Sequence, residues 1–433
     1  MDYNTASILL VILMLFLLFI GVPIAYSLGF SAMLIGSFAF GSICLQKAGW
    51  TTFALLYNLA WTPLPLFTLM AYLISETPIG EDIYKAARAW FSRVPGGIII
   101  ASVMGEAGIA AALGNSSATI ISVGKISVPE FRRYGYDETI GLGALTVGGI
   151  LGPLIPPSGT MIIYSVLGNV PLGHLFIAGV IPGILLAVML CIVPLIRCSI
   201  NPSLGPPAGK VRWKERFSSL KRVWPVALVM VCILGSIYFG IATPTEAGGV
   251  GSFVILIVAV AVYGLRKKGF LRAITETAKI NAMITVILVS STFFSYVLGS
   301  SAIAEKLTIL LGGLGVPPIV LIILIMIFLL FLGCFIDGTS IMFITIPILV
   351  PLVKGLGFDP VWFGVLFVVN LEMALITPPM AINFFIVRST FEISSRDLLR
   401  GVWPFMGVVI IFLLIILLFP KITLWLPSMM LTR

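Results

Sequence analysis

Two short polar stretches interrupt long apolar runs, and their residue types are suited to binding ions. GNSSAT covers Gly114–Thr119, and IDGTS covers Ile336–Ser340. Each stretch combines hydroxyl side chains with an amide or a carboxylate. Side-chain and backbone oxygens of this kind can replace the water oxygens around a hard cation such as Na⁺. The free N–H groups at the start of a helix can instead hold an anion.

A double proline follows each polar stretch along the chain. LIPPSGTM spans Leu154–Met161, and ITPPMAIN spans Ile376–Asn383. Because proline lacks an N–H group and clashes with the preceding turn, it breaks a helix and leaves carbonyl oxygens without partners. We therefore predict two paired sites, each formed by one polar stretch and one double proline.

Each of these polar residues also has a structural interpretation. Ser and Thr hydroxyl groups in membrane helices often bond only to a neighbouring carbonyl oxygen. A carboxylate near the middle of a membrane costs about 3 kcal/mol unless it has a partner, so Asp337 either binds a cation, contacts a substrate or bonds to the hairpin backbone. Glu106, Glu246 and Glu372 also fall in apolar runs. Glu246 is expected to cap a helix, whereas Glu372 can brace the second broken helix or exchange a proton.

The composition sets the class of protein in which these stretches lie. The chain has 433 residues, of which 59% are hydrophobic and 10% charged, and its mean hydropathy is +1.16. Long continuous apolar runs predict an all-α polytopic membrane protein, because a membrane β-barrel would show short alternating strands. The single histidine and the absence of a CxxC spacing argue against a metal or heme centre. No phosphate-binding GxxxxGK[ST] motif is present, so the chain does not hydrolyse a nucleotide.

The basic residues indicate how the chain crosses the membrane. With the N-terminus outside, one set of loops holds most of the 26 Lys and Arg residues and is assigned to the cytoplasm. The net charge of +9 is therefore a topology signal and does not indicate a nucleic-acid partner. This orientation requires segments 96–124 and 316–353 to enter and leave on the same side, as re-entrant hairpins. Their polar tips would then lie at membrane depth, where non-helical backbone is tolerated only inside protein or beside water.

The two halves of the chain match at a single offset of 222 residues, without a gap. The matched positions are Asn115 with Asp337, Ser117 with Thr339, Pro129 with Pro351, and Pro156-Pro157 with Pro378-Pro379. The charge assignment gives the halves opposite orientations, so we predict inverted repeats. Inverted repeats with paired interrupted helices are the architecture of secondary transporters that bind substrate near the membrane midplane.

The predicted organisation follows from this match. The first repeat covers 1–197, a cytoplasmic linker covers 198–222, and the second repeat covers 223–433. The first repeat contains an amphipathic arm at 81–92, a hairpin at 96–124 and a broken helix at 137–168. The second repeat contains the corresponding arm at 302–312, hairpin at 316–353 and broken helix at 361–387.

Three other functions share some of these features with a secondary transporter of this architecture. A stand-alone ion-coupled carboxylate carrier of similar fold is the nearest alternative. A membrane-embedded enzyme would gather acids or histidines at one membrane face, and a channel would favour a continuous polar lining over two closed hairpins. The paired interruptions favour a carrier, so we predict that the chain is not an enzyme.

Several long motifs carry a resemblance to a known family. They are GNSSATIISVGKISVPEFRRYGYD, GGILGPLIPPSGTMIIYS, ATPTEAGGVG, FIDGTSIMFITIPILVP and ITPPMAINFFIV. Over essentially its whole length the chain resembles the large membrane subunit of tripartite ATP-independent periplasmic (TRAP) transporters. The resemblance implies an elevator-type, Na⁺-coupled symporter with two Na⁺ sites in the bacterial inner membrane. It also implies a small membrane subunit of about four helices, a periplasmic substrate-binding protein, and import of an organic acid such as a C4-dicarboxylate, a sialic or other sugar acid, or a keto acid.

The resemblance also implies roles for individual residues. The substrate-binding residues would be Ser116, Ser117, Ser158 and Asp337. The Na⁺ ligands would come from the tips and double prolines around Asn115, Ser117, Gly152, Pro156, Gly338, Thr339, Thr377 and Met380. Where the first repeat has Ser158-Gly159, the second has Met380-Ala381, so the second cation site would rely more on backbone carbonyl oxygens.

Overall fold

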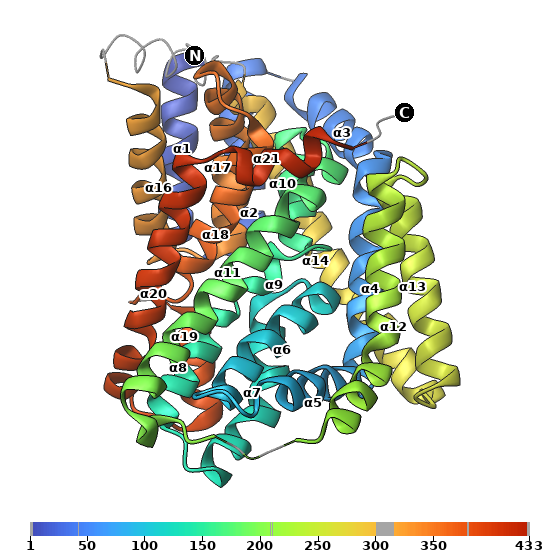
Figure 1. The fold of residues 1–433 in the computed structure, drawn as a ribbon. Helices are drawn as coiled ribbons and strands as arrows, with labels where there is room; N and C mark the ends of the chain where they lie inside the picture. The colour runs from blue at the N-terminus through green and yellow to red at the C-terminus, as the bar shows by residue number, and fades with distance from the viewer. Residues whose placement is uncertain are drawn as a thin grey trace.

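The computed structural model describes residues 3–41, 43–207, 209, 211–299, 316–378 and 381–430. Within these ranges every regular element is a helix, which confirms the predicted all-α class (Figure 1). The helices of the first half are α1 (Tyr3–Phe19), α2 (Ile24–Phe40), α3 (Ile43–Leu56), η1 (Leu59–Trp61), α4 (Pro63–Ser75), α5 (Ile79–Phe91), α6 (Gly97–Leu113), α7 (Ser116–Arg133), α8 (Glu138–Gly148), α9 (Leu151–Leu154), α10 (Gly159–Gly168) and α11 (Leu172–Ile200). Those that follow are η2 (Pro202–Leu204), α12 (Trp213–Tyr238), α13 (Pro244–Ala261), α14 (Lys267–Gly299), α16 (Pro318–Gly333), α17 (Gly338–Gly355), α18 (Pro360–Ala374), α19 (Ile382–Phe391), α20 (Ser395–Leu418) and α21 (Lys421–Ser428).

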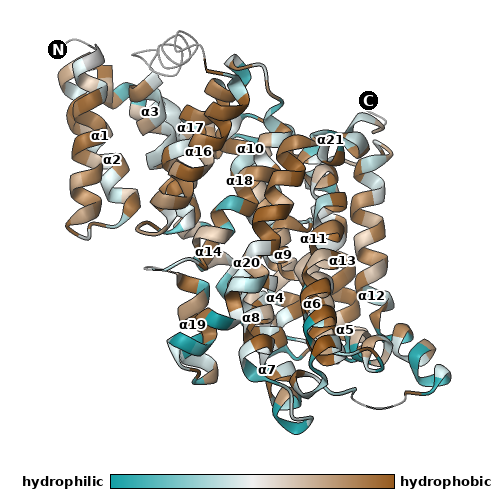
Figure 2. Ribbon diagram, turned by 60° about the vertical axis from the view of Figure 1, so that its left-hand side comes forward, coloured by the Kyte–Doolittle hydropathy of each residue, from teal (hydrophilic) through white to brown (hydrophobic). Residues whose placement is uncertain are grey.

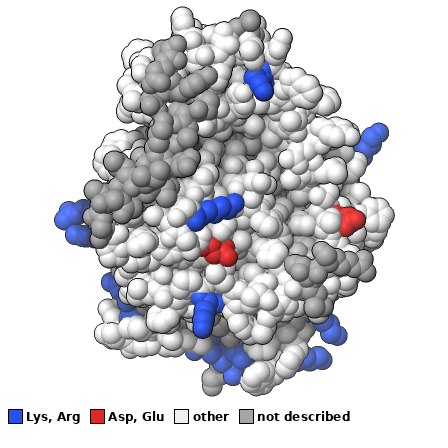
Figure 3. Space-filling view, turned by 90° about the horizontal axis from the view of Figure 1, so that it is seen from above, with Lys and Arg blue, Asp and Glu red and all other residues white. Residues whose placement is uncertain are grey.

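The described helices are long and apolar enough for a multi-pass membrane protein. Six of them satisfy the length and hydropathy needed to cross a membrane, and the number rises to eight if each of two bent pairs counts as one span. One bent pair is α3 with α4, at 56°, and the other is α8–α9 with α10, at 46°. Apolar residues cover most of the helix surfaces in Figure 2, and hydrophilic residues gather at the end where α5, α7 and α19 lie. The opposite face, seen in Figure 3, is mostly uncharged, with isolated charged side chains.

Both predicted hairpins are pairs of helices joined by a short break. The break between α6 and α7 holds Gly114 and Asn115, inside the polar stretch that the sequence singled out. The break between α16 and α17 covers residues 334–337 and ends at Asp337. Helix α7 continues to Arg133 with Pro129 inside it, so this limb extends beyond residue 124.

The other predicted segments lie as follows. The arm at 81–92 falls on α5, and the arm at 302–312 lies outside the described residues. The linker at 198–222 contains the end of α11 and the start of α12. Some of its charged residues therefore lie on a helix. Lys, Arg and Glu have a high helix propensity, so their presence is compatible with a helix as well as with a solvated linker.

Two groups of helices contact each other, and the candidate binding site lies at the boundary between them. Helix α4 packs against α13 and α14, and α12 packs against α13 and α5. These five helices, α4, α5 and α12–α14, form the first group, and α6–α10 with α17–α19 form the second, which we call the central bundle. Its interior is tightly packed, because every residue of α18 from Val361 to Ala374 is buried. In Figure 1 the pair α12 and α13 stands beside α4, away from α8, α19 and α20.

Candidate binding site

The tip of the first hairpin is shaped by two residues suited to a helix boundary. Gly114 ends α6 in the left-handed conformation, with φ 59°, which glycine adopts without strain. Asn115 then caps α7: its side-chain Oδ1 accepts a hydrogen bond of 3.0 Å from the backbone N–H of Ala118. Its carbonyl oxygen accepts from the N–H of Thr119 at 3.1 Å and from the Thr119 hydroxyl at 2.8 Å. The polar stretch therefore forms a compact start of α7, and Asn115 itself remains exposed.

This tip packs directly against the first double-proline break. A Cβ atom on Gly114 would lie 2.7 Å from the carbonyl oxygen of Pro157. A Cβ atom on Gly152 would lie 2.9 Å from the carbonyl oxygen of Asn115 and 3.0 Å from the nitrogen of Ser116. Only glycine permits such close backbone approach at these positions. The structure thus brings together Asn115, Gly152 and the double proline, the three parts of the predicted first cation site.

The double-proline break of the first half also ends in a helix cap. The Ser158 side chain accepts a hydrogen bond of 3.3 Å from the N–H of Met161 at the start of α10. Ser158 is fully buried, so its hydroxyl serves the helix start rather than an open cavity. Pro156 is buried beside it.

The tip of the second hairpin has the same cap chemistry. The Asp337 carboxylate accepts a hydrogen bond of 2.9 Å from the N–H of Ser340, and the Ser340 hydroxyl also donates to it. The structural interpretation of Asp337, a bond to its own hairpin, is therefore present in the fold. The Asp337 side chain is exposed and borders a cavity of about 300 Å³ beside the α1–α2 turn.

The remaining residues of the predicted second cation site lie near the end of α18. A Cβ atom on Gly338 would lie 3.3 Å from the side chain of Leu371 in α18. The Thr377 hydroxyl donates to the carbonyl oxygen of Met373 at 2.8 Å, so it is already partnered within its own turn. Met380 lies outside the described residues. The second tip thus contacts the second broken helix, as the first tip contacts the first.

Asn383, which the sequence analysis did not single out, connects the two halves. Its side-chain oxygen accepts a hydrogen bond of 2.8 Å from the Ser117 hydroxyl, and its amide nitrogen donates to the Ser116 oxygen at 3.1 Å. Asn383 is fully buried, and Glu372 also interacts with Asn383 and Ser116. One Glu372 carboxyl oxygen has no hydrogen-bond partner among the described residues. The residue matched to Asn383 at the offset of 222 is Met161, so the repeat comparison gave no signal for it.

A cavity of about 370 Å³ lies where the hairpin tips face α4 and α14. The central bundle contributes Asn115, Ala118, Pro157, Gly159, Thr160 and Thr339 to its lining. Across from them are Thr68, Tyr72 and Ser75 of α4, and Ile280, Met283 and Ile284 of α14. None of the residues that line this cavity is charged. Because α7, α10 and α17 all begin at or near it, their positive ends and free N–H groups can hold an anion there.

The four predicted substrate residues do not line this cavity. Ser116 and Ser158 are buried, Ser117 is bonded to Asn383, and Asp337 borders the smaller cavity. Asn115 and Thr339, which the sequence assigned to different cation sites, line the same cavity. The α4 and α14 residues carried no sequence signal, because their spacing is that of ordinary membrane helices. The assignment of the four residues to substrate stays a prediction.

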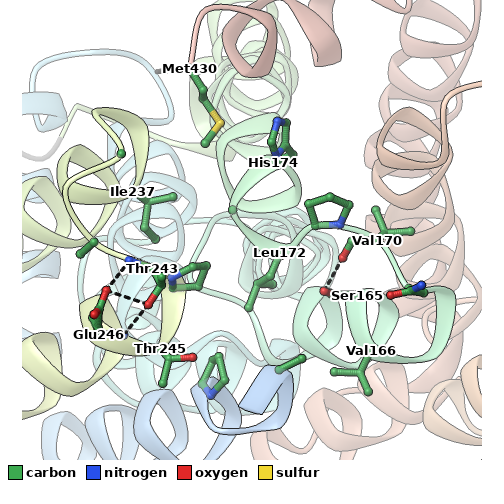
Figure 4. Close-up of a pocket in the computed structure, with 18 of the residues that line it drawn as sticks. Ser165, Val166, Val170, Leu172, His174, Ile237, Thr243, Thr245, Glu246 and Met430 are labelled. Atoms are coloured by element: carbon green, nitrogen blue, oxygen red, sulfur yellow. Dashed lines mark hydrogen bonds between the residues drawn. The ribbon is translucent and has the colours of Figure 1, made fainter. Parts of the chain in front are cut away.

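A larger cavity, of about 700 Å³, lies apart from the hairpin tips (Figure 4). Its walls come from the α10–α11 and α12–α13 connections, and they include Ser165, His174 and Thr243. The Glu246 carboxylate accepts from the Thr243 N–H at 2.7 Å, and the Glu246 N–H donates to the Thr243 hydroxyl at 3.3 Å. This reciprocal arrangement caps α13, as the sequence predicted. None of the predicted site residues lines this cavity, so the hairpin tips remain the candidate binding site.

Apolar helices of membrane-spanning length whose interrupted elements meet at an uncharged cavity are the arrangement of a membrane transport protein. Residues 11–422 match the family described as tripartite ATP-independent periplasmic transporter, DctM component. The chain belongs to this family, as a large permease subunit, which confirms the resemblance seen in its motifs.

Individual relatives agree with this assignment. The chain is 31% identical to the sialic acid TRAP transporter large permease protein SiaM of Vibrio cholerae, over 96% of this chain and 97% of that protein. It is 33% identical to the C4-dicarboxylate TRAP transporter large permease protein DctM of Pseudomonas aeruginosa, over 84% and 85% of the two chains. The fold is also similar to that of the YdaH transporter of Alcanivorax borkumensis, with a TM-score of 0.57, 13% identity and 88% of each chain covered.

Proposed function

We propose that this chain is the membrane-spanning carrier of a Na⁺-coupled importer of an organic acid, working in the bacterial inner membrane. The observation that carries the proposal is the uncharged cavity at which the tips of both hairpins, Asn115 and Thr339, meet. An organic anion would be held there by helix starts, hydroxyl groups and bound cations instead of by arginine. The relatives named for sialic acid and C4-dicarboxylates support a carboxylate substrate.

Two Na⁺ sites fit the repeated local geometry. Asn115 and Asp337 each cap the helix after a hairpin tip, by accepting from the N–H three residues later. Each tip also packs against a broken helix of its own half, through Gly152 in the first half and Gly338 in the second. Oxygen atoms from a tip and a break would surround each cation. The caps at Asn115 and Asp337 match at the offset of 222 and support the repeat, whereas the opposite orientation of the halves rests on the charge assignment.

The position of the cavity supports an elevator mechanism. Its lining is divided between the central bundle and the helices α4 and α14, so a sliding movement of the bundle would carry the bound anion with it. A binding protein that docks differently on the two states would bias this movement, whereas equal affinity for both would shift nothing. A small membrane subunit would give α4, α12 and α13 a fixed surface in the membrane.

The test is uptake into liposomes that contain the purified chain, with labelled sialic acid and a labelled C4-dicarboxylate as probes. We expect negligible uptake by the chain alone under an inward Na⁺ gradient. Adding the small subunit and the cognate binding protein should restore uptake without ATP, and replacing Na⁺ with K⁺ should abolish it. Robust Na⁺-driven uptake by the single chain would refute the tripartite assignment and favour the stand-alone carboxylate carrier.

A further inference from the structure

Glu106 is a carboxylic acid in the interior of the central bundle, away from the cavity. It lies in α6 with none of its surface exposed, and both of its carboxyl oxygens lack a hydrogen-bond partner among the described residues. The carboxyl group rests on Gly148, the last residue of α8, where a Cβ atom would lie 1.9 Å from Oε2. A glycine at this position therefore leaves room for the acid.

The helices packed against α6 offer this carboxyl group no cation. They are α4, α5, α7, α8, α9 and α11. On α5, the ring of Tyr84 faces α6 at Gly105, and its hydroxyl donates to Glu130 at 3.0 Å. Burial, with the Glu130 carboxylate beside it, raises the pKa of Tyr84 well above its usual range, so this group stays neutral. Arg88 of α5 is paired with Glu130 of α7 at 2.6 Å.

The other charged and titratable groups on these helices lie elsewhere: Asp82 of α5 accepts a hydrogen bond from Tyr263 at 3.2 Å, and His174 of α11 lines the larger cavity. Lys85 pairs with Glu81 along α5, and Arg132 of α7 pairs with Glu138 of α8, all at partly exposed positions. Lys125, Arg133 and Arg197 are exposed, and Tyr72 of α4 lines the cavity.

An ionised carboxylate in such surroundings would be desolvated without compensation, whereas the protonated form avoids that penalty. We propose that Glu106 is a proton-binding site of the central bundle and that its proton stays bound throughout transport. The carboxyl group lies away from the first hairpin tip, because Glu106 precedes Asn115 by nine residues, or about 13 Å of helix. The carboxyl group rests on Gly148 of α8, which belongs to the central bundle together with α6, so these two helices would move together and keep the proton between them.

The proposal can be tested on the full chain in lipid nanodiscs by infrared spectroscopy, which distinguishes the C=O stretch of a protonated carboxyl group from the bands of a carboxylate. We expect a protonated-carboxyl band that persists from mildly acidic to mildly alkaline pH and exchanges slowly in D₂O. The difference spectrum between wild type and Glu106→Gln should contain this band, whereas any contribution from the other buried acid, Glu372, is common to both proteins and cancels. Glu130→Gln is the matched control, because Glu130 is paired with Arg88 at 2.6 Å, and it should leave the band unchanged. A wild-type spectrum without a protonated-carboxyl band, or a carboxylate band lost in Glu106→Gln, would overturn the proposal.

Transport then separates a resident proton from an exchanged one. Glu106→Gln preserves shape without charge, so uptake by the assembled transporter should stay within about twofold of wild type, with the same pH profile. Glu106→Met provides a second neutral side chain of similar length if the amide packs poorly. A folded neutral variant that loses uptake, or whose pH profile changes, would show that the proton leaves during the cycle and would refute its permanent residence.

Discussion

Gly152→Ala should weaken Na⁺ binding, because Gly152 holds the first double-proline break against the first hairpin tip. The added Cβ would lie 2.9 Å from the carbonyl carbon and oxygen of Asn115 and 3.0 Å from the nitrogen of Ser116. All three are backbone atoms, so no side chain can rotate away. The short helix α9 must therefore withdraw from the tip by about half an ångström, and overpacking of this kind typically costs about 1–3 kcal/mol.

This overpacking energy would distort the geometry of the proposed cation site. If it is expressed entirely in cation binding, an energy of about 1–3 kcal/mol corresponds to an approximately 5- to 150-fold weaker affinity for Na⁺. The assay is thermal unfolding of the purified chain at increasing Na⁺, with K⁺ holding the ionic strength constant. A bound cation stabilises the folded state in proportion to the logarithm of its concentration above Kd, so weaker binding moves the onset of stabilisation to higher Na⁺.

Gly159→Ala is the matched control for this experiment. Gly159 lies at the same break, but its Cβ would meet only the flexible Leu64 side chain, at 3.8 Å, which is an ordinary contact. Its Na⁺ response should equal that of the wild type. If Gly152→Ala also responds to Na⁺ like the wild type, the contact between tip and break does not form a cation site, and the reasoning fails.

Three further predictions follow from the site. Asn383→Ala removes two hydrogen bonds, at 2.8 and 3.1 Å, and leaves serine hydroxyl groups without partners. The free energy of unfolding of the purified chain should therefore fall by about 2–4 kcal/mol. An unchanged free energy of unfolding would contradict the role of Asn383 in joining the two halves. Asp337→Asn keeps a good helix cap and removes the charge, so folded yield should change little while Na⁺-driven uptake falls; retained uptake would leave Asp337 with its capping role alone. Single cysteines at the exposed positions Ser203 and Gly355 should react with an impermeant reagent only from the cytoplasm and only from outside, respectively, and labelling from the same side would refute the inverted topology.

The sequence alone identified features that depend on neighbouring residues. Long apolar runs predicted the helices, and the polar stretches predicted where they break. The caps formed by Asn115 and Asp337 are contacts between residues three apart, so residue type and spacing are enough to specify them. The same holds for the capping box of Thr243 and Glu246. Family membership also followed from the sequence, because the motifs are long and specific.

The tertiary structure decided which distant residues meet. Asn383 bonds to Ser116 and Ser117 across more than 260 positions of the chain, and its apolar match in the other half gave no sign of this contact. The lining of the cavity depends on where α4 and α14 lie beside the tips. That the Glu106 carboxyl group has no hydrogen-bond partner among the described residues depends on how the six neighbouring helices pack around it. Helix formation follows the local periodicity of a sequence, whereas packing between helices depends on side-chain shape at contacts that no local pattern records.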